Sequence, residues 1–120
     1  MKFPAWYGIS VGALIILQWI FFLATGSVPE LEIAPWEIAT HISAELLLAL
    51  TLLTGGIGTL RSVKRGKTLL LVALGMAMYS EINSSGYFAQ LGQWSLVVMF
   101  VLLLLAAAWS VSVLLKEGNN

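Results

Sequence analysis

Four long apolar segments, separated by short polar connections, make up most of this 120-residue chain. They lie at about residues 4–24, 36–60, 68–88 and 94–115. Each has the roughly 20 apolar residues that an α-helix needs to cross the hydrocarbon core of a bilayer. Lipid offers no partner for backbone N–H and C=O groups, so such segments fold as helices. The sequence therefore predicts an all-α fold: a four-helix transmembrane bundle that forms a single integral membrane domain over residues 1–120.

The composition agrees with a membrane location and excludes several other classes of function. The chain is 59% hydrophobic and 10% charged, whereas soluble domains carry about 25% charged residues. The formal net charge is +0, so no basic surface is available for nucleic acid. The sequence contains no cysteine, which excludes disulfides, thiolate metal sites and thiol catalysis. The lipid bilayer is therefore the first expected partner.

The basic residues predict how the chain is oriented in the membrane. Four of the six lie in the short connection at residues 61–67, and the other two are Lys2 and Lys116 near the two ends of the chain. Short loops rich in Lys and Arg face the cytoplasm. With four crossings, both termini then lie on the cytoplasmic side and the acidic connection at residues 25–35 lies outside. We expect the protein in a prokaryotic plasma (inner) membrane.

Ionisable side chains within the second and third apolar segments mark a candidate site. Glu37, His41 and Glu45 follow one another at four-residue spacing, which places them on one face of a helix. Glu81 lies in the third segment, which the short basic connection makes an antiparallel neighbour of the second. Each ionisable group in the membrane costs roughly 2.5–3.5 kcal/mol on insertion scales, so it needs a partner or water. We therefore expect His41, Glu45 and Glu81 to meet in the outer half of the bilayer.

Glu37 lies at the mouth of this predicted pocket, where solvation by interfacial water is its ordinary role. Six other polar residues come at a similar depth and are candidates for the surrounding shell or for ligand binding: Gln18, Thr40, Tyr79, Asn83, Ser84 and Tyr87. The polar run Asn83–Gly86 also predicts an interruption of the third helix, and broken helices mark binding sites in many transporters.

Three interpretations of the polar site remain open at this level. The first is a divalent metal site for Zn, Mn or Fe with His41, Glu45, Glu81 and Glu37 as ligands, because one imidazole and several carboxylates suit these ions. The second is a proton-linked ligand site or a small proton-coupled transporter, because carboxylates and an imidazole exchange protons near neutral pH. The third is a structural clamp between helices in a non-catalytic membrane subunit or scaffold. No catalytic residue is indicated, and enzymatic activity stays open.

Small residues predict where helices pack most closely. Gly8 and Gly12 form a GxxxG pair in the first segment, and Gly55 and Gly58 lie near the end of the second. Glycine faces of this kind let two membrane helices approach each other closely. A chain of 120 residues encloses little volume, so a homo-oligomer or a membrane partner subunit is expected.

Overall fold

The protein is described by a computed structural model covering residues 2–118, and this range contains helices and no strand. The predicted all-α fold is therefore confirmed. The described residues form five helices: α1 (Lys2–Ala24), α2 (Glu30–Ile33), α3 (Pro35–Leu60), α4 (Gly66–Gln90) and α5 (Trp94–Gly118).

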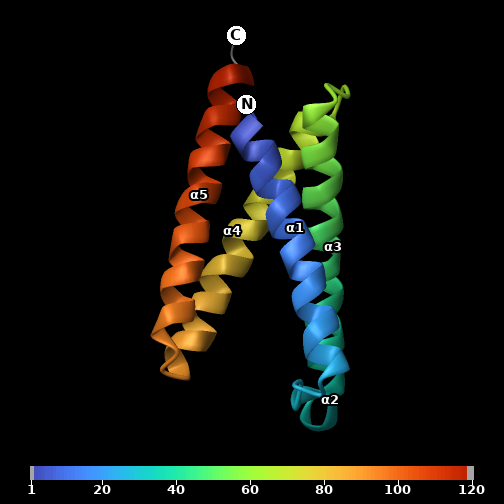
Figure 1. The fold of residues 1–120 in the computed structure, drawn as a ribbon, viewed down its shortest axis with the longest axis vertical. Helices are drawn as coiled ribbons and strands as arrows, with labels where there is room; N and C mark the ends of the chain where they lie inside the picture. The colour runs from blue at the N-terminus through green and yellow to red at the C-terminus, as the bar shows by residue number, and fades with distance from the viewer. Residues whose placement is uncertain (1, 119–120) are drawn as a thin grey trace.

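The four long helices are arranged as two pairs that diverge. In Figure 1, α1 lies beside α3 and α4 lies beside α5, and both pairings involve extensive contacts. The pairs come together near the turn between α3 and α4 and separate toward the end that carries α2. The start of α1 and the end of α5 lie at the same end of the molecule as the α3–α4 turn. The basic residues near these points are therefore gathered at one end.

The contact between α3 and α4 depends on glycine. A Cβ atom on Gly55 would lie 2.7 Å from the backbone N and Cα of Leu70, and one on Gly66 would lie 2.5 Å from the carbonyl carbon of Gly58. Real Cβ atoms do not approach other atoms so closely, so only glycine permits this distance between the two backbones. This crossing fixes the point from which the two helix pairs diverge.

A second glycine contact joins α1 to α3. A Cβ atom on Gly12 would lie 2.9 Å from the carbonyl oxygen of Ala49, and one on Gly8 would lie 3.1 Å from the carbonyl oxygen of Leu52. The buried apolar cluster occupies the same region, where fully buried leucines of α3 and α4 pack against α1 and α5: Leu52, Leu70 and Leu74. The core thus lies toward the α3–α4 turn.

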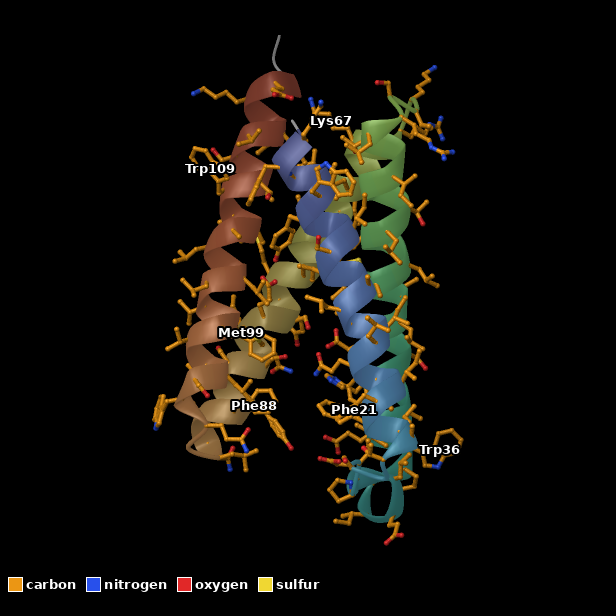
Figure 2. The ribbon with its side chains drawn as sticks, viewed as in Figure 1. Phe21, Trp36, Lys67, Phe88, Met99 and Trp109 are labelled. Carbon is orange, nitrogen blue, oxygen red and sulfur yellow. The ribbon has the colours of Figure 1, made fainter. Side chains whose placement is uncertain are left out.

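Three of the described helices are long and apolar enough to span a membrane: α1, α3 and α5. The remaining long helix, α4, contains Lys67, Glu81 and a polar second half. Aromatic residues lie exposed at both ends of the molecule, with Trp36 near α2 and Trp109 toward the opposite end, where Lys67 also lies (Figure 2). Most of the large exposed side chains are apolar, as expected for a surface in contact with lipid.

Two sequence expectations about the helices need correction. The connection at residues 25–35 contains the short helix α2, which was not predicted because a single turn has no hydrophobic periodicity. The predicted interruption at Asn83–Gly86 is wrong, since α4 is continuous from Gly66 to Gln90. A glycine inside a helix costs only about 1 kcal/mol relative to alanine. The helix α4 packs against both α3 and α5, and the Ser85 hydroxyl donates to the Ile82 carbonyl within the helix.

Candidate functional site

A buried carboxyl group lies where three helices meet. Glu81 of α4 is only 5% exposed, and its Oε2 accepts a hydrogen bond of 2.5 Å from the hydroxyl of Tyr7 in α1. Tyr7 is buried as well. The same hydroxyl lies 2.9 Å from the backbone carbonyl oxygen of Leu103 in α5. The Tyr7 side chain thereby links α1, α4 and α5 through polar contacts inside an apolar core.

The Tyr7 hydroxyl has one hydrogen, and two acceptors lie within hydrogen-bonding distance of it: Oε2 of Glu81 and the Leu103 carbonyl oxygen. The hydroxyl can share its hydrogen between Glu81 and the Leu103 carbonyl. It can also donate fully to Leu103 while a protonated Glu81 donates to the hydroxyl oxygen. The two arrangements differ in the proton held by Glu81. The hydrogen-bonding pattern of this cluster is thus coupled to the protonation of one carboxyl group.

The second oxygen of Glu81 has no hydrogen-bond partner. Among the described residues, Oε1 of Glu81 is buried and receives no hydrogen bond from any protein group. A buried polar atom left in this state costs about 1–3 kcal/mol, and more when it is charged. Most such atoms in proteins are matched by a water molecule or a ligand. Glu81 therefore retains an unused acceptor.

Glu45 of α3 is held by the residue that precedes Glu81. The hydroxyl of Ser80 donates to Oε2 of Glu45 at 2.9 Å. Other helical Ser and Thr hydroxyls bond to carbonyl oxygens four residues earlier in their own helix: Thr40, Ser43, Thr51, Thr54, Thr59 and Ser110. Ser80 instead reaches across to α3. The carboxyl groups of Glu45 and Glu81 are close enough to interact electrostatically.

A cleft of about 260 Å³ lies between α3 and α4, on the side where Ser80 meets Glu45. Its α3 wall consists of His41, Ala44, Glu45 and Leu48, and its α4 wall consists of Met76, Tyr79, Ser80 and Asn83. His41 is exposed and Tyr79 is 75% exposed. The cleft is therefore accessible from outside the protein, and each wall carries both polar and apolar side chains.

The predicted site residues form two groups. His41 and Glu45 line the cleft together, and the His41 ring packs edge-on against Trp19 at a centroid distance of 5.8 Å. Glu81 is buried, does not line the cleft, and accepts the hydrogen bond from Tyr7. Glu37 is exposed and lies outside the residues that line the cleft.

The six further candidates are also divided. Tyr79 and Asn83 line the cleft, and Tyr87 donates a hydrogen bond of 3.3 Å to Glu30 of α2. The Thr40 hydroxyl bonds to the Trp36 carbonyl of its own helix. Gln18 is exposed and Ser84 is half-buried, and neither lines the cleft.

Tyr7 and Ser80 were missed by the sequence prediction. Tyr7 lies in an almost uniformly apolar segment, so periodicity cannot select its inward face. One signal was available, because Tyr7 directly precedes Gly8 of the GxxxG pair and shares its buried face with Val11. Ser80 directly precedes Glu81, and a helical hydroxyl beside a buried carboxyl group is a plausible bridge to a second helix.

No group of three or more His, Cys, Asp or Glu side chains in residues 2–118 is arranged to hold a metal ion. The hydrogen bonds explain why the carboxyl groups of Glu45 and Glu81 do not converge on one point. Oε2 of Glu81 is engaged by Tyr7, and Oε2 of Glu45 is engaged by Ser80. The cleft itself presents only two of the predicted ligands, His41 and Glu45.

Comparison with known proteins identifies the family. The chain belongs to the family described as "Domain of unknown function (DUF8058)", whose model matches residues 1–120. No curated protein and no solved structure matches the chain. The description names no activity, so the function is argued from the geometry of the site.

Proposed function

We propose that the protein is a four-span membrane protein whose cleft between α3 and α4 binds a small ligand from the outer side, with binding linked to proton exchange. The observation that carries this proposal is the buried Tyr7–Glu81 pair, whose carboxyl group interacts electrostatically with Glu45 of the cleft wall. A cluster of this kind serves binding better than it serves packing. Interhelical hydrogen bonds in membranes are worth about 0.6 kcal/mol on average, which does little to offset the burial of a carboxyl group.

The four-span topology is supported by how α4 is packed. It has 25 residues and lies between α3 and α5, both of which are apolar enough to span a membrane. If those two helices cross the bilayer, α4 crosses with them. The end that carries residues 61–67 and Lys116 then faces the cytoplasm. The divergent end of the helix pairs, toward which the cleft lies, faces outward.

Proton linkage is supported by the groups that face Glu81. They are the Tyr7 hydroxyl from α1, which also contacts the Leu103 carbonyl of α5, and the Glu45 carboxyl from α3. His41 and Glu45 also line the cleft. A ligand that changes the charge balance near these groups changes which of them holds a proton, and so its affinity depends on pH.

Two other interpretations of the same residues have less support. Zn²⁺ sites usually take three or four protein ligands, and a metal in the cleft would find His41 and Glu45. A scaffold that binds partners through glycine would need free glycine faces. Cβ positions at Gly8, Gly12 and Gly55 are already occupied by atoms of this chain's own helices.

The first test is access to the cleft from outside. Because the chain lacks cysteine, Asn83→Cys gives a single thiol in the cleft wall. In sealed cells a membrane-impermeant maleimide added outside should label it. Gly75→Cys, on the same helix and in open space, is a control at a different depth. If Asn83→Cys reacts only after the membrane is permeabilised, the proposed orientation is wrong.

The second test is binding of matched small probes to the purified full chain in nanodiscs. The set is n-butylammonium, n-butanol, butyrate, Zn²⁺ and Mn²⁺, measured by calorimetry in two buffers of different ionisation enthalpy. At least one organic probe should bind, should exchange protons, and should lose affinity in Glu45→Gln. Failure of all three organic probes would contradict the proposal. Binding of Zn²⁺ or Mn²⁺ alone would favour the metal interpretation.

A further inference from the structure

The geometry of the cleft points to its ligand class: a small protonated amine with a short apolar chain. This inference rests on the proposed function and adds the chemistry of the ligand. The relevant observations are the charge of the walls, their hydrogen-bonding capacity, and the size and polarity of the space.

The charge around the cleft selects against anions. Its lining contains the Glu45 carboxyl group and no Lys or Arg, and Glu45 also interacts electrostatically with the buried Glu81. All six basic residues are at positions 2, 61–67 and 116, at the opposite end of the molecule. His41 is the only lining group that can become positive. An anionic ligand would face the Glu45 carboxyl group, with His41 as the one lining group able to offset the repulsion.

The hydrogen-bonding groups require a ligand that donates. Ser80 donates only to Oε2 of Glu45, so the other oxygen of this carboxyl group can accept a hydrogen bond from a ligand. An ammonium group offers three N–H donors and no acceptor, so it complements the Glu45 carboxyl group in both charge and hydrogen bonding. A quaternary ammonium ion carries the charge and lacks these donors.

The remaining surface of the cleft favours an apolar chain on that amine. Ala44, Leu48 and Met76 form the apolar part of the lining, and Tyr79 adds an aromatic side chain. An aromatic face attracts a cation, and methionine adapts to irregular ligands. The volume of about 260 Å³ is below the range of about 300–1,000 Å³ that holds drug-sized ligands. One ammonium group and a short alkyl chain match this space.

The inference is tested by binding of n-butylammonium to the full chain in nanodiscs. It should bind at least tenfold more tightly than n-butanol and butyrate, which have similar chains without the positive charge. Methylammonium should bind more weakly because it leaves the apolar part of the lining uncovered. Tetramethylammonium should bind more weakly because it donates no hydrogen bond.

Substitutions then assign the binding to the cleft. Glu45→Gln should weaken n-butylammonium binding about tenfold, the loss expected when a charged hydrogen-bonding partner is removed. Glu37→Gln, in the same helix and outside the cleft, should leave affinity unchanged. Tyr79→Leu should weaken binding by a few-fold through loss of the aromatic face, and this exposed position keeps the test valid if Glu45→Gln does not fold.

Each outcome has a distinct meaning. If n-butanol or butyrate binds as tightly as n-butylammonium through Glu45 and exchanges protons, the amine inference is overturned and the proposed function stands. If Glu37→Gln weakens binding as much as Glu45→Gln, the amine does not occupy the cleft and the inference is overturned. If none of the organic probes binds, both the inference and the proposed function fail.

Discussion

The side chains of Tyr7 and Glu81, which are 74 positions apart in the sequence, meet at 2.5 Å inside the protein. This contact joins the first helix to α4, and the second contact of the Tyr7 hydroxyl, with the Leu103 carbonyl, extends the link to α5. The two diverging helix pairs are therefore held together by a polar contact as well as by glycine packing. Its removal should therefore lower the stability of the fold.

We predict that Tyr7→Phe destabilises the protein by about 1–3 kcal/mol, because Glu81 is left buried with no donor to either carboxyl oxygen. Unfolding of the purified protein by denaturant in mixed micelles measures the change. Tyr79→Phe is the matched control, since Tyr79 is 75% exposed, and it should change stability by less than about 0.5 kcal/mol. Equal effects of the two substitutions would show that the Tyr7 hydroxyl does not stabilise the fold.

The pair can also be removed as a unit. In the double variant Tyr7→Phe/Glu81→Met both polar partners are replaced by apolar groups of similar size, which can be nearly neutral. We expect it to be more stable than the sum of the two single variants, with a coupling energy of about 0.5–3 kcal/mol. Additive losses would mean that Tyr7 and Glu81 act independently.

Glycine packing at the α3–α4 crossing gives the next prediction. Gly55→Ala places a methyl group 2.7 Å from the backbone of Leu70, so the helices must separate, at a cost of about 1–3 kcal/mol. Gly75→Ala in α4 meets nothing within 4 Å and should stabilise the helix by up to about 1 kcal/mol. Thermal unfolding of both variants provides the measurement. A Gly55→Ala variant as stable as Gly75→Ala would contradict the close contact.

The orientation in the membrane can be tested at the two ends of the molecule. Val63 lies in the basic turn and is 58% exposed, and Ile33 lies in α2 and is 81% exposed. With an impermeant maleimide added outside intact cells, Ile33→Cys should be labelled and Val63→Cys should be protected until the cells are permeabilised. The reverse pattern would place the basic turn outside.

The hydrogen bond from Tyr87 to Glu30 spans the diverging ends of the helix pairs. We predict that Tyr87→Phe broadens the distance distribution between spin labels at Ile33→Cys and Leu91→Cys. The hydrogen bond is exposed and measures 3.3 Å. Its loss should therefore change the ratio between the bonded and the separated arrangement of these helix ends by about fivefold or less. Double electron–electron resonance on the otherwise cysteine-free chain measures it. An unchanged distribution would mean that the bond does not restrain this end.

The sequence was sufficient for the helices and for the faces of α3 that carry polar groups. Apolar length set the four long segments, and the four-residue spacing of His41 and Glu45 placed both in one cleft. The sequence did not predict the partner of Glu81, which comes from α1. The prediction compared depths by counting residues along each helix, as if all helices were parallel and began at the same level. The α4–α5 pair is inclined to the α1–α3 pair, so Tyr7 can reach Glu81.

The divergence of the two helix pairs from a glycine crossing has a mechanical consequence. A helix of 25 residues is about 37 Å long, so tilting it by roughly 5° about one end moves the other end by roughly 3 Å, by simple geometry from that length. A small change of tilt at the crossing near Gly58 and Gly66 therefore produces a displacement of several ångströms at the far end of the helix. Changes of side-chain volume there should widen or narrow the cleft between α3 and α4 without changing any residue that lines it.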